Sequence, residues 1–330
     1  MLRHSSDSEP GYTRQRKGEK WAYFDGDTRV TDRDEIDRLN GLALPPAYID
    51  AWFCKSENGH IQATGTDARG RKQYRYNADY RAKQDASKYA GCREFGEALP
   101  KIRKRVEADL KRRALGRDQV LAAVVRLLDT EHMRIGNEQY ARANKSFGLS
   151  TLRTRHVRKK NGRVKIRYTG KHGIVHEASI TDTALKRIVG KCQELPGQML
   201  FQYLTDEGEP CPISSSDVND YIREASGGEF TAKHFRTWGA SVIAFEQLLA
   251  KDDAEKLSVK TMIEPVAEAL GNTVTISRKS YVHPSLIDAL KDRPDDPLRG
   301  MVRPRARRRL SSTETAFLKF LKKKPRRKKT

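Results

Sequence analysis

The sequence predicts an α+β protein, in which a small N-terminal β-rich domain precedes a larger, mostly α-helical domain with a three-stranded β insertion. Three observations support this prediction. Residues 20–80 hold short strand-like segments, WAYFDG, HIQATG and GRKQYRYN, and no long helical period. From about residue 84, apolar residues recur at spacings of three and four. The stretch VRKKNGRVKIRYTGKHGIVHEASI then returns to strand-like alternation, with Asn161-Gly162 as a hairpin turn.

The helical elements follow from their apolar periodicity. The first predicted helical region, which begins near residue 84, carries an apolar stripe. The segment QVLAAVVRLLDTEHMRI predicts the next helix. After the β insertion, helices are expected at 182–192, 215–226 and 231–250. The stripe of the first helix consists of Phe95, Leu99, Ile102, Val106 and Leu110, and that of the last of Phe235, Trp238, Val242, Phe245 and Leu249.

Charge supplies the first indication of function. The 330 residues carry a formal net charge of +22, and residues 291–330 hold 16 Lys and Arg against 4 Asp and Glu. The rest of the chain is also basic, so a polyanionic partner is favoured, nucleic acid before an anionic membrane surface. A merely solubilising surface explains KKKPRRKKT but fits a basic folded body less well.

Other classes are disfavoured by what the sequence lacks. The first twenty residues have no apolar signal region, and no apolar run approaches the ~18 residues of a membrane span. The four cysteines are far apart, which indicates free thiols in a reducing compartment rather than a metal site. P-loop, dinucleotide, HExxH and GxSxG motifs do not occur, so we expect no cofactor and no metal.

Four residues stand out by their setting. Tyr281 lies in a basic, hydroxyl-rich stretch, LGNTVTISRKSYVHP. Arg134 follows a long apolar helix, and Arg236 adjoins the apolar stripe of the last helix. A buried arginine is costly unless it is paired or faces an anion, so each is either part of a structural salt bridge or an anion ligand. Lys171, at the tip of the YTGKHG turn, is either an ordinary exposed lysine or part of the same site.

Four segments together resemble a type IB DNA topoisomerase of the compact bacterial and poxviral kind: QATGTDARGRKQYRY, RIGNEQYA, YTGKHG with KHFRTWGA, and NTVTISRKSYVHP. The resemblance covers about residues 20–290. It implies that Tyr281 is the nucleophile, that Arg134 and Arg236 clamp the phosphate, and that Lys171 is the general acid. It assigns the remaining phosphate contact to Asn272, where many relatives have histidine.

The same resemblance implies DNA contacts outside the catalytic set. These fall on Gln73, Tyr74, Tyr76, Tyr140 and Lys233. Ordinary packing of a β-sheet is the alternative for the tyrosine pair. Asn137 and Gln139 stand where the poxviral proteins have lysines, so the cleavage-site preference of those proteins does not carry over.

The implied activity is relaxation of positive and negative supercoils through a 3′-phosphotyrosyl intermediate, without ATP or metal. The implied partner is double-stranded DNA, clamped by a monomer in the bacterial cytoplasm, at the nucleoid. The expected domain limits are a flexible arm at 1–19, a β-rich DNA-binding domain at 20–85, a catalytic domain at 86–290 and a basic, disordered tail at 291–330.

Two alternatives remain open. A tyrosine recombinase shares the nucleophile and two arginines, but GRKQYRYN and KHFR, where a recombinase has HxxR, favour the topoisomerase. A non-enzymatic DNA-organising protein would explain the charge but would leave Tyr281, Lys171 and the arginines as coincidence.

Overall fold

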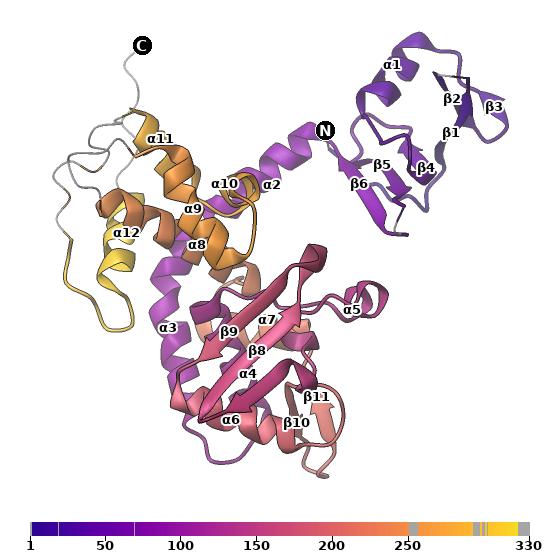
Figure 1. Ribbon diagram of the computed structural model, residues 1–330. Helices are drawn as coiled ribbons and strands as arrows, with labels where there is room; N and C mark the ends of the chain where they lie inside the picture. The colour runs from indigo at the N-terminus through magenta and orange to yellow at the C-terminus, as the bar shows by residue number, and fades with distance from the viewer. Residues whose placement is uncertain are drawn as a thin grey trace. The chain divides into compact units, whose positions relative to one another are not determined.

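The computed structural model describes residues 2–18, 20–68, 70–250, 257–292, 298, 301 and 303–322, without the side chains of 85–88. It divides into two compact units, Met1–Lys88 and Tyr89–Thr330 (Figure 1). Helix α2 (Ala78–Ala90) runs across the boundary. The predicted α+β class is confirmed. None of the described helices combines the length and apolar character that a membrane span requires.

The first unit is built on a six-stranded antiparallel sheet with the order β3-β2-β1-β4-β5-β6. A small core around Phe53, Tyr23 and Leu39 lies between this sheet and helix α1. Helix α1 was not predicted, because it has only nine residues; Asp32 caps its N-terminus. The elements are β1 (Gly11–Lys17), β2 (Lys20–Asp25), β3 (Thr28–Arg29), α1 (Arg33–Gly41), β4 (Ile49–Cys54), β5 (Ile61–Thr66) and β6 (Lys72–Tyr76).

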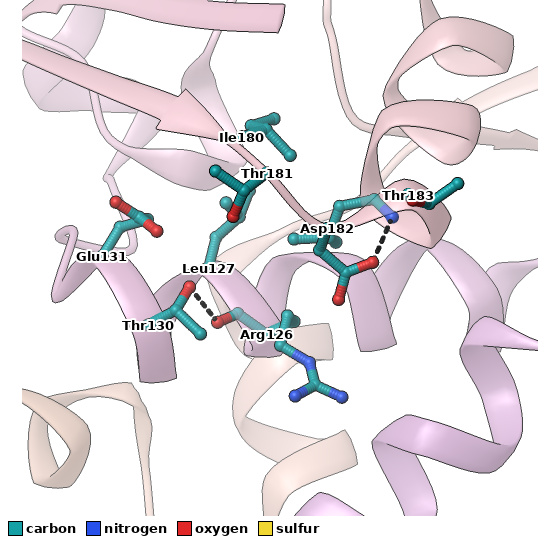
Figure 2. Close-up of a pocket in the computed structure, with 9 residues that line it drawn as sticks. Arg126, Leu127, Thr130, Glu131, Ile180, Thr181, Asp182 and Thr183 are labelled. Atoms are coloured by element: carbon teal, nitrogen blue, oxygen red, sulfur yellow. Dashed lines mark hydrogen bonds between the residues drawn. The ribbon is translucent and has the colours of Figure 1, made fainter. Parts of the chain in front are cut away.

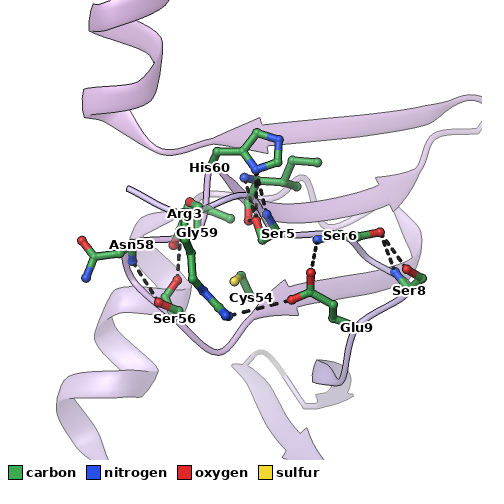
Figure 3. Close-up of polar contacts among 12 residues, drawn as sticks. Arg3, Ser5, Ser6, Ser8, Glu9, Cys54, Ser56, Asn58, Gly59 and His60 are labelled. Atoms are coloured by element: carbon green, nitrogen blue, oxygen red, sulfur yellow. Dashed lines mark hydrogen bonds and ion pairs between the residues drawn. The ribbon is translucent and has the colours of Figure 1, made fainter. Parts of the chain in front are cut away.

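The flexible arm expected at 1–19 is corrected by the structure, since Gly11–Lys17 form β1 and the residues before it lie along the sheet (Figure 3). Arg3 forms an isolated parallel β-bridge with Gly59, and the Arg3 carbonyl accepts a hydrogen bond from His60 N at 2.9 Å. The buried Ser5 donates its hydroxyl to Ile61 O at 2.9 Å and accepts Ile61 N at 3.0 Å. Contacts of this kind involve the backbone, and a polar composition does not reveal them.

The second unit is mostly helical and has one large apolar core. The predicted three-stranded insertion is confirmed as the antiparallel sheet β7-β8-β9, whose inward residues Val164, Ile166 and Tyr168 are buried. The helices and strands of the second unit before α6 are α3 (Cys92–Leu110), α4 (Arg117–Glu131), α5 (Glu138–Asn144), β7 (Val157–Lys160), β8 (Arg163–Thr169) and β9 (Val175–Ile180). The later ones are α6 (Thr183–Glu194), β10 (Gln202–Leu204), β11 (Pro210–Pro212), α7 (Ser215–Ser226), α8 (Ala232–Leu249), α9 (Val259–Leu270), α10 (Val274–Ser280), α11 (Pro284–Asp292) and α12 (Ser312–Lys322).

The disordered tail expected at 291–330 is corrected for Ser312–Lys322, which form α12 and pack against α3 and α8 (Figure 1). Phe317 is fully buried among aromatic rings. The largely buried carboxylate of Glu314 accepts Arg103 Nη2 at 2.8 Å and Trp238 Nε1 at 3.1 Å, so its charge is compensated. Residues 323–330, with most of the KKKPRRKKT run, lie outside the described residues.

Candidate active site

Tyr281 follows the last residue of α10, a short helix that Thr273 caps by accepting Ile276 N at 3.2 Å. Ser241 of α8 contacts this turn on both sides of the tyrosine. The hydroxyl of Ser241 donates to Thr237 O of its own helix at 2.8 Å and lies 3.4 Å from Tyr281 O, and the same hydroxyl oxygen accepts His283 N at 3.0 Å. The backbone on both sides of the tyrosine is therefore held by a fully buried serine.

Arg236 lies in the buried face of α8, as predicted, with 4% of its surface exposed. Its guanidinium donates to His132 O and, at 3.2 Å, to Leu270 O, and its Cζ lies 4.9 Å from the centre of the Tyr281 ring. Among the described residues no carboxylate forms an ion pair with it, and its Nε is buried without a hydrogen-bond partner. The described residues therefore give no support to the salt-bridge alternative for Arg236, and its role as an anion ligand stays a prediction.

Arg134 follows the left-handed C-cap of α4 at His132 and is anchored by its carbonyl, which accepts Leu149 N at 2.9 Å. Its Nη2 donates to the amide oxygen of Asn272 at 2.7 Å. This bond orients the Asn272 amide, whose Nδ2 is buried without a partner among the described residues. A donor group of this kind can bind an anionic oxygen.

The electrostatic setting of Tyr281 differs from that of an ordinary core tyrosine. Burial alone raises the pKa of its phenol, but Arg236 and Arg134 outweigh burial, so the pKa lies below its usual value. Tyr168 on β8 shows the opposite balance: its burial outweighs the same two arginines and raises its pKa to about 12. Of these two phenols, Tyr281 is the one whose ionised form the site favours.

Lys171 lies exposed at the start of a single 3-10 turn, Lys171–Gly173, between β8 and β9. Lys171 takes part in none of the hydrogen bonds described above for Tyr281, Arg134, Arg236 and Asn272. The hairpin predicted for Lys171 is confirmed, and its role as general acid stays a prediction. Lys233 is exposed in the first turn of α8, and Tyr140 is half-buried in α5.

The three predicted DNA contacts of the first unit lie on β6, with alternate residues facing opposite ways. Tyr74 and Tyr76 are 44% and 42% exposed and stack on each other with ring centres 6.0 Å apart. These exposed rings do not pack as core residues. Gln73 faces the other way and donates to Asp67 Oδ2 at 3.0 Å.

Sequence reasoning missed two histidines of the site. His132 supplies the carbonyl that accepts Arg236, and its ring packs on the Cα of Gly239 in α8. His176 is not among the site residues predicted from the sequence, yet burial and the positive charges of Arg134 and Arg236 lower the pKa of its ring. The strand alternation that points Tyr168 inward does the same for His176, which pairs with it across the hairpin, so the signal was present.

A cavity of about 410 Å³ lies elsewhere in this unit, between the end of α4 and the segment from β9 to α6 (Figure 2). Glu131 and Asp182 line it together with Arg126, and Asp182 already caps α6. Its two carboxylates make it unsuited to a polyanion, and it shares no residue with the tyrosine site.

A β-rich N-terminal unit, a helical unit with a three-stranded insertion, and a tyrosine whose pKa two arginines lower are the features expected of an enzyme that acts on phosphodiesters. Comparison with known proteins specifies the family. Residues 77–296 match the model of the eukaryotic DNA topoisomerase I catalytic core, and residues 20–67 match that of the bacterial DNA topoisomerase IB N-terminal domain. The chain belongs to the type IB DNA topoisomerases, isomerases that relax supercoiled DNA by transient single-strand cleavage.

Individual relatives agree with this assignment. The chain is 32% identical over 299 residues to DNA topoisomerase 1B of Acanthamoeba polyphaga mimivirus, an alignment that covers 86% of this chain and 89% of the relative. It is 22% identical over 240 residues to DNA topoisomerase 1B of vaccinia virus (strain Copenhagen), covering 69% and 72%. With the mitochondrial DNA topoisomerase I of Rattus norvegicus it shares 27% over 186 residues, covering 53% and 29%.

Proposed function

We propose that this topoisomerase cleaves one DNA strand with Tyr281 and holds it as a 3′-phosphotyrosyl ester. The phenolic oxygen bonds to phosphorus, the P–O5′ bond breaks, and the 5′-oxygen leaves with the electron pair. The phenolic proton passes to solvent, and Lys171 protonates the leaving oxygen. Religation is the reverse, so the phosphoester energy is conserved and we expect no requirement for ATP.

The observation that carries this proposal is the pair of arginines at the Tyr281 phenol. Their charge favours the phenolate, and their planar donor forks suit the non-bridging oxygens of a phosphodiester. Each well-placed donor contributes about 3 kcal/mol of transition-state stabilisation. Asn272 adds a neutral donor through its Nδ2. Because arginines supply the positive charge, we expect activity in EDTA.

Lys171 suits the task of general acid because a lysine ammonium offers three N–H donors on a flexible side chain. An alkoxide is a much stronger base than a phenolate, so the leaving oxygen needs a proton more than the nucleophile needs a base. A positioned acid contributes roughly 10²–10⁴-fold.

Duplex DNA is the substrate, and we propose that a monomer clamps it with both domains in the bacterial cytoplasm. The exposed Tyr74 and Tyr76 on β6 and the exposed Lys233 on α8 support contact with DNA. Binding should weaken steeply with salt, because phosphate contacts release counterions. Affinity that hardly changes with salt would count against such a clamp.

The decisive experiment is relaxation of positively and negatively supercoiled plasmid in EDTA without ATP. The wild-type protein should relax both, and Tyr281→Phe neither. Denaturant quenching of the wild-type reaction should trap protein on the 3′ end of the nick. An active Tyr281→Phe variant, or protein attached to the 5′ end, would refute the proposal.

A further inference from the structure

His176 connects the two backbone segments that carry Lys171 and Asn272. It is the second residue of β9, is half-buried, and stacks on Tyr168 of β8 with ring centres 5.3 Å apart and planes 19° apart. The two residues are directly paired in the hairpin. The hairpin therefore holds the imidazole plane firmly on one side.

Two glycines contact the edges of this ring. A Cβ at Gly170 would lie 2.5 Å from His176 Cδ2, and one at Gly271 would lie 2.5 Å from His176 Cε1. Neither distance is possible for a real Cβ, so only glycine lets the backbone approach the ring from both sides. Gly170 directly precedes Lys171, and Gly271 directly precedes Asn272.

The ring is suited to this place because it is neutral. Burial lowers the pKa of His176, and the positive charges of Arg134 and Arg236 lower it further. Tyr168, which also packs on it, has a pKa raised to about 12 and is uncharged as well. An uncharged imidazole adds no repulsion beside the two arginines, so its contribution is one of shape and position.

We propose that His176 is a positioning residue, whose ring sets the Lys171 turn at a fixed distance from the Asn272 turn and thereby aims Lys171 at the leaving oxygen. This rests on the proposed function. Lys171 is exposed on a three-residue turn, so its own side-chain contacts do not fix it. The contact between the His176 ring and Gly170, the residue before Lys171, fixes the backbone that carries Lys171. A misplacement of about 1 Å can cost 10²-fold in rate.

The test compares two DNA substrates in single-turnover cleavage. One has an ordinary 5′-oxygen at the cleaved bond, and the other has sulfur in its place. A thiolate leaves without protonation, because thiols have pKa values of about 8.5. Cleavage of the sulfur substrate therefore needs Tyr281 and the phosphate clamp but no acid. Lys171→Ala supplies the reference for a lost acid.

His176→Ala should slow cleavage of the oxygen substrate by about 10–10²-fold and leave the sulfur substrate close to wild type. His176→Phe keeps a flat ring against both glycines and should restore most of the oxygen rate. His156→Ala is the matched control, since His156 is a half-buried imidazole of the same unit that packs closely on Phe147 and meets the Tyr168 ring only at a tilted 6.5 Å between centres. It should leave the ratio of the two rates unchanged.

Equal slowing of both substrates by His176→Ala, or no slowing of either, would overturn the proposal. Failure of His176→Phe to restore the oxygen rate would also overturn it, because the role would then need the ring nitrogens. Two other results would refute the proposed function itself. These are cleavage of the sulfur substrate by Tyr281→Phe and equal slowing of both substrates by Lys171→Ala.

Discussion

Replacing Phe317 by alanine should strongly destabilise the larger unit, although its segment has the composition of a charged tail. Phe317 is fully buried, and its ring centre lies 5.3 Å from those of Trp238 and Phe245. Removal of a buried phenylalanine side chain costs about 3–5 kcal/mol. That loss is a large part of the ~5–15 kcal/mol by which a domain is stable.

Urea unfolding followed by tryptophan fluorescence measures this loss. Trp238 is the one tryptophan of residues 89–330, so replacing Trp21 and Trp52 by phenylalanine in every protein compared makes the signal specific. With a slope of about 1–3 kcal/mol per molar urea, the midpoint should fall by about 1 M or more. Lys319→Ala, an exposed position of the same helix, should change stability by less than about 0.5 kcal/mol.

The reasoning is refuted if Phe317→Ala and Lys319→Ala shift the midpoint alike. In that case α12 would not belong to the core, and residues 312–322 would be the tail that their composition suggests.

Three other outcomes follow from the site and its support. Arg236→Lys should slow single-turnover cleavage by about 10²-fold or more, because an ammonium cannot keep two carbonyl contacts and still present a donor fork; an unchanged rate would contradict this. The Tyr281 phenol should titrate below its usual pKa in ultraviolet difference spectra that lose this signal in Tyr281→Phe, and Arg236→Met should raise it. The lowered pKa of Tyr281 stabilises the folded protein; this contribution to folding stability is fully present above about pH 10 and is lost as pH falls through the lowered pKa. Glu314→Ala should cost about 3 kcal/mol or more in urea unfolding, since it removes a charge partner from the largely buried Arg103; a loss under about 1 kcal/mol would contradict this.

The sequence predicts those parts of the fold whose signal is local. The apolar stripe of α8 marks its buried face, so the burial of Arg236 could be inferred from the periodicity of that one segment. The Asn161-Gly162 turn and the alternation around it likewise place the three-stranded insertion. In both cases the period of a single segment contains the information.

The elements that sequence reasoning missed depend on partners far away in the chain. Strand β1 carries Arg14, whose half-buried guanidinium donates to Leu44 O at 2.8 Å and lies 4.1 Å above the Trp21 ring. No local pattern indicates that a strand so rich in arginine can be covered. Helix α12 has the same character, because Glu314 becomes buried only when Arg103, some two hundred residues earlier, neutralises it.

The site shows the same division between residue identity and geometry. The motifs identify Tyr281, Arg134, Arg236 and Asn272, but not that Arg134 donates to the Asn272 amide oxygen at 2.7 Å. This bond bears on the replacement of histidine by asparagine. A protonated histidine would carry charge to the phosphate but would repel Arg134 and could not accept its hydrogen bond. An amide accepts from Arg134 with its oxygen and still offers its nitrogen, so it holds the arginine in place while it donates. On the proposed function, the positive charge at the phosphate must then come from Arg134, Arg236 and Lys171, so the rate should depend strongly on the position of Lys171 and on the His176 ring proposed to set it.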